Sequence, residues 1–247
     1  MRNLIEQQLG FMKEIGYETI EKAPKGVGEI VECFNFWIDT IQPMLTDYAK
    51  GMTLSDIRWG AVLYKELNWA GHSAIFRAYL DCLRTLRGIF EMLVQTHILE
   101  KNCQIPREQD RFSFILSRLW ELDESYQTFR VGMVDRMPGF DHEEQVRLRN
   151  LYHELSLYSH PSGRQLDLES APVPLLDFKK ADFELCTRLM LDVTDLMVAV
   201  AIELCPEISG VLREWLDRTK SWEQMQSWGM LMSLRRRSES RTERRTS

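Results

Sequence analysis

The sequence contains Arg147-Leu-Arg-Asn-Leu-Tyr-His-Glu-Leu-Ser-Leu-Tyr-Ser-His-Pro-Ser-Gly163, a stretch with two distinct faces when it is placed on an α-helix. Each residue of a helix turns by about 100°, so residues three, four or seven positions apart share a face. One face is polar and consists of Arg149, His153, Ser156 and His160. The other face is apolar and consists of Leu148, Leu151, Leu155 and Tyr158. The pattern predicts a helix that packs its apolar side on a core.

Both ends of this helix are predicted by nearby residues. Asp141 is followed three residues later by Glu144, which is the spacing of a capping box at a helix start. Pro161 cannot continue the helical hydrogen bonds and disfavours the helical conformation at His160, so the helix should end near His160. Tyr152 lies at the edge of the polar face.

The polar face suits two kinds of role. Histidines beside an arginine and hydroxyl groups could perform general acid–base chemistry or bind an anion. The alternative is a hydrogen-bonded internal network that only stabilises the fold. The sequence alone leaves both interpretations open.

Residues 73–101 form the longest periodic segment and predict a long central helix, because they are apolar over most of the helix circumference. A narrow polar strip runs along this helix: Arg77, Asp81, Arg84, Gly88, Glu91 and Gln95. Arg87 and Glu91 form a further i,i+4 pair. Either the strip is solvated, or it faces the polar side of the 147–163 stretch across a cleft.

The remaining periodicity predicts an all-α fold. Helices are expected at 1–22, 29–50, 53–70, 108–136 and 178–205, with breaks at 23–28 and 137–140 and an irregular loop at 163–177. The expected parts are an N-terminal helix and linker (1–28), a helical-bundle core (29–205), a C-terminal amphipathic helix (206–234) and a disordered basic tail (235–247). The C-terminal helix is rich in Trp and Met, so it either packs on its own domain or docks a partner protein.

The composition is that of an ordinary soluble chain of 247 residues, with 44% hydrophobic and 28% charged residues and a net charge of −6. The basic tail carries +4 and the rest therefore carries −10, which argues against a general nucleic-acid coat. Five cysteines without a CxxC pair indicate a reducing cytoplasm. The polar N-terminus is no signal peptide and no membrane segment is expected, so the predicted location is cytoplasmic.

No metal and no cofactor are expected. The sequence lacks a Gly-rich phosphate loop, an HExxH motif and a nucleophile elbow. Its histidines also lack the Glu-x-x-His spacing of a dimetal helical bundle.

Leu151-Tyr-His-Glu-Leu-Ser-Leu-Tyr-Ser-His-Pro-Ser162 resembles a signature of bacterial and archaeal helical families near the HEPN superfamily. Arg87-Gly-Ile-Phe-Glu91 is similar to the Arg-x-x-x-Glu that these families place upstream. The resemblance covers about residues 74–204. It implies an HEPN-like helical bundle that is often a homodimer.

In active members of that superfamily, an arginine and a histidine at the start of a helix cut RNA without a metal. The resemblance therefore implies His153 or His160 as the general base, of which we predict His153, and Arg147 or Arg149 as the residue that stabilises the phosphorane charge. The other candidates are pocket or structural residues: His160, Ser156, Tyr152, Arg84, Arg87 and Glu91.

Two functions follow from these observations. The first is an HEPN-like interaction or regulatory module that keeps the polar pocket without catalysis. The second is a metal-independent endoribonuclease of a defence or toxin type, which would bind RNA or another anionic partner through its arginines. The acidic body favours the first, because RNA affinity depends on clustered basic charge.

Overall fold

The computed structural model describes residues 2–36, 54–102, 129–158 and 177–204. The predicted all-α fold is confirmed, since this part of the chain contains helices and no strand. Its α-helices are α1 (Arg2–Lys22), α2 (Pro24–Phe36), α4 (Leu54–Ile75), α5 (Tyr79–Asn102), α8 (His142–Ser156) and α10 (Lys180–Leu204). A 3-10 helix, η2 (Val131–Arg136), precedes α8.

Several predictions fall outside the described residues. They concern the loop at 163–176, the amphipathic helix at 206–234 and the basic tail at 235–247. Within the described ranges, no helix is long and apolar enough to cross a membrane.

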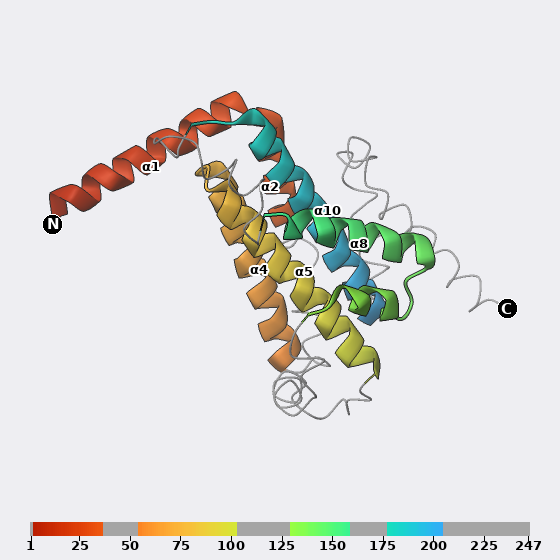
Figure 1. The fold of residues 1–247 in the computed structure, drawn as a ribbon. Helices are drawn as coiled ribbons and strands as arrows, with labels where there is room; N and C mark the ends of the chain where they lie inside the picture. Colours follow the sequence, from red (N-terminus) through yellow and green to blue (C-terminus); the bar gives the residue numbers. More distant parts are fainter. Residues whose placement is uncertain (1, 37–53, 103–128, 159–176, 205–247) are drawn as a thin grey trace.

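The core lies where α5 packs against α4, α8 and α10 (Figure 1). α4 and α5 run antiparallel, and α10 packs across both. Fully buried side chains in this region include Phe90 and Leu93 of α5 and Phe183 of α10. Burial of one such side chain stabilises a fold by about 1.5–3 kcal/mol, so these contacts are a main source of stability.

The turn between α4 and α5 lies at residues 76–78 and corrects a prediction. The sequence predicts that the first of these helices ends near residue 70 and that the second begins at Ser73. α4 instead continues through Gly71, and α5 begins at Tyr79. The chain turns at Arg77, which has a φ of 64°. Few residues with a side chain adopt this left-handed conformation, so the sequence held no signal for the turn.

The predicted break at 23–28 is shorter in the structure: the chain leaves the helix only at Ala23, and α2 begins at Pro24 and not at residue 29. Proline suits the first position of a helix, where its missing N–H is not needed. Gly26 lies inside α2, and a Cβ there would come within 2.4 Å of Phe183 Cε1 on α10. Close packing between the two helices therefore offsets the low helix propensity of this glycine.

Two glycines on neighbouring helices are expected to respond in opposite ways to substitution. A Cβ at Gly71 would lie 2.6 Å from Phe34 Cζ and 3.0 Å from Ile30 Cγ2, both on α2. A Cβ at Gly88 on α5 would meet nothing within 4 Å among the described residues. We expect Gly71→Ala to lower the free energy of unfolding by about 1 kcal/mol through overpacking. Gly88→Ala should raise it by about 0.5–1 kcal/mol through helix propensity. Thermal unfolding of both variants measures this, and a shift of the same sign in both would contradict the packing of α4 on α2.

The segment before α8 contains less α-helix than predicted. A helix was expected over 108–136, but in its described end residues 129–130 are not helical and residues 131–136 form the 3-10 helix η2. The turn expected at 137–140 is confirmed, with Gly139 at a φ of 84°. This turn leads the chain from η2 into the start of α8.

Candidate functional site

The start of α8 is the predicted capping box. The Asp141 carboxylate accepts a 2.9 Å hydrogen bond from the Glu144 N–H, and the Asp141 N–H donates a 2.8 Å bond to the Glu144 carboxylate. Such a cap contributes about 1 kcal/mol to helix stability. The predicted apolar face is buried along the helix and its C-terminal turn: Leu148, Leu151, Leu155 and Tyr158. Cap and apolar face together fix which side of α8 faces the bundle.

The end of α8 differs from the prediction. The α-helix ends at Ser156, and the Leu157 N–H bonds to both His153 O and Glu154 O at 3.2 Å. Bonds to the third preceding residue tighten the last turn of a helix, so the chain leaves α8 before His160. The predicted end near His160 is therefore wrong, and His160 itself lies outside the described residues.

Arg87 connects α5 to α8 and is the centre of the candidate site. Its Nε donates to Glu91 Oε1 at 2.8 Å, and its Nη2 lies 3.3 Å from the Tyr152 hydroxyl oxygen. The guanidinium carbon is 5.4 Å from the centroid of the Tyr152 ring, within cation–π range. The Arg87 and Glu91 side chains are only 17% and 27% exposed. Their ion pair is therefore screened less than one on the open surface.

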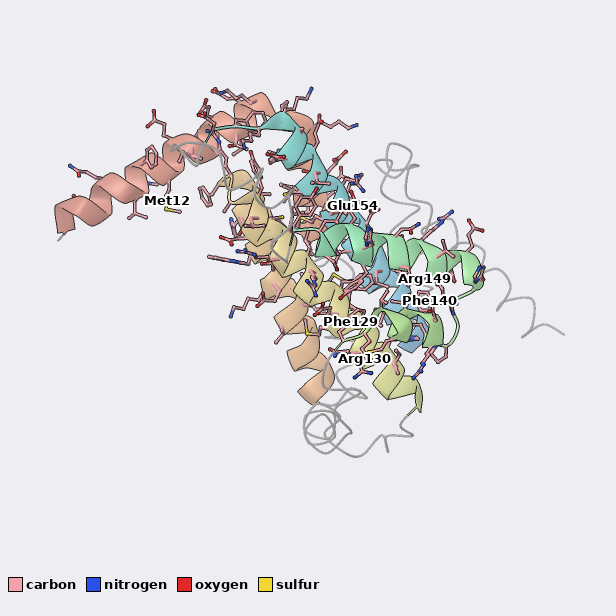
Figure 2. The ribbon with its side chains drawn as sticks, in the orientation of Figure 1. Met12, Phe129, Arg130, Phe140, Arg149 and Glu154 are labelled. Carbon is pink, nitrogen blue, oxygen red and sulfur yellow. The ribbon has the colours of Figure 1, made fainter. Side chains whose placement is uncertain are left out.

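Two further aromatic rings enclose Tyr152. The Phe129 ring lies 4.6 Å from the Tyr152 ring, and the Phe90 ring lies 5.7 Å from it. Phe129, labelled in Figure 2, precedes η2. The cluster therefore joins three segments of the chain: α5, α8 and the residues before η2. We call Arg87, Glu91, Tyr152, Phe90 and Phe129 the Arg87 cluster. Through the ion pair with Glu91 and the contact with Tyr152, Arg87 stabilises the packing of α5 on α8.

The two arginines of α8 lie on different sides of the helix, because two positions correspond to about 200°. Arg149 Nε is 3.3 Å from Asp135 Oδ1 on η2, whereas Arg147 Nη2 is 2.8 Å from Glu143 Oε1 on α8 itself. His153 is exposed and lies one turn beyond Arg149. Arg149, and not Arg147, therefore shares a face with the predicted general base.

Two other predicted pocket residues, Arg84 and Ser156, have environments unlike that of Arg87. Arg84 is 45% exposed, and its Nη1 lies 3.8 Å from Asp81 Oδ1 on the same helix. Ser156 Oγ is buried and has no hydrogen-bond partner among the described residues. The structure thus joins Arg87, Glu91 and Tyr152 in one cluster and places Arg149 with His153 on the outer side of α8.

Sequence reasoning missed an ion-pair network that ties α8 to α10. Arg188 of α10 makes a two-pronged contact with the Glu154 carboxylate, with Nη1 to Oε2 at 3.1 Å, and it lies 3.6 Å from Asp192. Hydrogen bonding to Glu154 raises the pKa of Arg188. The i,i+4 spacing of Arg188 and Asp192 was visible in the sequence, but the contact with Glu154 was not.

Asp195 is the second residue that was missed. Its side chain is buried on α10, and its Oδ1 has no hydrogen-bond partner among the described residues. Burial raises the pKa of Asp195 well above its ordinary value, and the negative charges of Asp192 and Glu144 act in the same direction. The positive charge of Arg147 only partly opposes them. A buried carboxyl in this setting favours its neutral form.

In the described ranges, no group of three or more His, Cys, Asp or Glu side chains is arranged to hold a metal ion. Comparison of the chain with protein-family models, with curated proteins and with solved structures finds no match.

Proposed function

We infer that this chain is an HEPN-like helical module that acts by binding other macromolecules and does not cleave RNA. The observation that carries this proposal is the pairing of the candidate arginines. Arg147 lies against Glu143, Arg149 against Asp135, and Arg87 against Glu91. An arginine that stabilises a phosphorane must present its guanidinium to the phosphate, and each of these guanidinium groups already faces a carboxylate.

The charge balance supports the same proposal. The chain carries a net charge of −6, and the acid–arginine pairs of α8 and η2 neutralise one another locally. Proteins that bind nucleic acid through its phosphates concentrate unpaired basic charge on one face. In the proposed module, the Arg87 cluster stabilises the packing of α5 against α8.

The second candidate is the metal-independent endoribonuclease, and one observation favours it. Arg149 and His153 lie one turn apart on the accessible side of α8, and the Arg149–Asp135 pair is 39% and 44% exposed. An exposed pair holds its partners weakly, so a phosphate could displace Asp135. His153 would then take the proton from a ribose 2′-hydroxyl as its oxygen attacks the phosphorus, and Arg149 would stabilise the charge that develops. The bond to the 5′-oxygen breaks, that oxygen leaves with a proton taken from water, and a 2′,3′-cyclic phosphate remains.

An RNA cleavage assay in the presence of a chelator separates the two candidates. We expect no cleavage by the purified chain above the buffer background. The comparison set is His153→Ala and Arg149→Ala, with His72→Ala as the control, because His72 is exposed in the last turn of α4 and not on α8. Cleavage by the wild-type protein and by His72→Ala, but not by His153→Ala, would overturn the proposal. Cleavage that persists in every variant comes from a contaminating nuclease.

A further inference from the structure

The N-terminal half of α1 projects from the bundle (Figure 1). α1 contacts α2 and α4, and its buried residues belong to its second half, where Ile15 and Thr19 are 6% and 0% exposed. Residues 2–14 correspond to an arm of about 20 Å at the usual rise per residue. A helix of this length is marginally stable in water by itself, and here it continues the packed second half of α1.

Apolar side chains stand exposed on this arm. Leu9, Phe11 and Met12 are 53%, 52% and 45% exposed. Figure 2 shows Met12 on the projecting part of the helix. Leu9 and Met12 share one face and form an uncovered apolar strip among the described residues, the kind that marks an interaction site, whereas Phe11 lies on another side of the helix.

The exposed stripe continues a buried one. Leu9, Met12, Gly16 and Thr19 are spaced by three, four and three residues, which is the spacing of a coiled-coil seam. In the second half of α1 this seam is covered by the α4–α5 corner, where a Cβ at Gly16 would lie 3.3 Å from Phe76 Cε1. The first half repeats the same pattern without that cover.

We propose that the α1 arms of two copies of this chain pair as an antiparallel coiled coil, with Leu9 of one copy opposite Met12 of the other. The inference rests on the proposed function as a binding module and names its partner. The flanking charges favour this register. With Leu9 at position a and Met12 at position d of a heptad, Glu6 and Lys13 both occupy position e. Antiparallel helices bring e positions together, so Glu6 of one copy lies beside Lys13 of the other. The two-fold axis makes this contact twice.

The bundle itself also favours the antiparallel direction. Each arm leaves its own bundle at the corner around Phe76, so antiparallel arms place the two bundles at opposite ends of the coil. Parallel arms would bring both bundles to the same end. The seam is short compared with stable interfaces, so we expect the dimer to depend on protein concentration.

Sedimentation equilibrium of the full chain over a series of concentrations tests the proposal. The wild-type protein should approach twice its chain mass of 29.1 kDa as the concentration rises. Met12→Glu should shift the dissociation constant at least tenfold toward monomer. The matched control is Tyr17→Glu, which adds the same charge at a residue that is 69% exposed and lies off the seam. A wild-type protein that stays monomeric, or equal shifts in both variants, would overturn the proposal.

Disulfide trapping tests the direction of the arms. Leu9→Cys copies mixed with Met12→Cys copies should cross-link to each other faster than either cross-links to itself, with the wild-type cysteines as background. Faster self-cross-linking of both variants would indicate parallel arms and contradict the register. These outcomes are independent of the RNA assay, so a failed pairing leaves the non-catalytic module standing, and detected RNA cleavage leaves the pairing of the arms standing.

Discussion

Replacement of Asp195 by Asn is expected to stabilise this protein at pH 8 by about 3 kcal/mol, because at that pH the folded state must either keep this buried carboxyl protonated or bury its charge, and both are costly. Asp195 is buried between α10 and α8, faces the like charges of Asp192 and Glu144, and is only partly offset by Arg147. Asparagine keeps the shape of the side chain and removes the charge. The Tm of the variant should therefore exceed that of the wild-type protein.

The sign of the pH dependence follows from the pKa. Burial first, and Asp192 second, raise the pKa of Asp195 in the folded state above its ordinary value of 3.8. Between these two pKa values the folded state holds a proton that the unfolded state has lost, so stability falls as the pH rises through this range. Below pH 3.8 Asp195 is protonated in both states, so its stabilising contribution to the free energy of unfolding is fully present. The advantage of Asp195→Asn should therefore vanish near pH 4 and grow toward pH 8.

Thermal unfolding of both proteins from pH 4 to pH 8 measures this difference. Glu184→Gln is the matched control, because Glu184 lies on the same helix with its side chain 64% exposed. It should follow the wild-type protein at every pH. If Asp195→Asn were less stable than the wild-type protein at pH 8, the carboxylate would have a charged partner that stabilises its ionised form, and the assignment of a neutral Asp195 would be wrong.

Replacement of Arg77 is expected to release α1 from the bundle. The Arg77 side chain is 4% exposed, and its Nη2 lies 2.6 Å from Glu18 Oε2 while its Nε donates to Thr19 Oγ1 at 3.0 Å. Its guanidinium also lies 5.9 Å from the centroid of the Phe178 ring, just before α10. One side chain thus connects α1, the α4–α5 corner and the start of α10. Loss of the buried hydrogen bond to Thr19 should lower the free energy of unfolding by about 1–3 kcal/mol.

Two substitutions at Arg77 separate the effect of losing the side chain from the effect of the left-handed backbone conformation. Arg77→Gly and Arg77→Ala both remove the guanidinium, but only glycine adopts a φ of 64° without strain. Both variants should be less stable than the wild-type protein, and the free energy of unfolding of Arg77→Gly should exceed that of Arg77→Ala by about 1 kcal/mol. Chemical denaturation measures this free energy for the two variants and the wild-type protein. An Arg77→Ala protein as stable as the wild-type protein would show that this corner does not hold α1.

The loss of stability at low pH gives a second test of the contacts made by Arg77. Lys22 first, and Arg77 second, lower the pKa of Glu18 from its ordinary value of 4.5 to about 2. The stabilisation from these contacts is fully present above pH 4.5 and is lost as the pH falls toward 2, because the unfolded state binds a proton first. Both Arg77 variants should lose less stability than the wild-type protein over this range, since Lys22 alone remains.

Short-range sequence patterns account for much of the candidate site. The capping box of Asp141 and Glu144, the turn at Gly139 and the Arg87–Glu91 pair each depend on residues at most four positions apart. Interactions of this range are set by the helix geometry itself, so their spacing identifies them. The burial of the apolar face of α8 follows from the same periodicity.

The contacts between elements depend instead on how the helices pack. Tyr152 reaches Arg87, Arg149 pairs with Asp135 and Glu154 pairs with Arg188 because separate helices are brought side by side, and no spacing along the chain encodes these distances. The helix boundaries that were wrong have the same origin. Gly26 stays helical because α2 packs closely on Phe183, and the chain turns at Arg77, where the bonds to Glu18 and Thr19 help to offset the cost of a left-handed backbone.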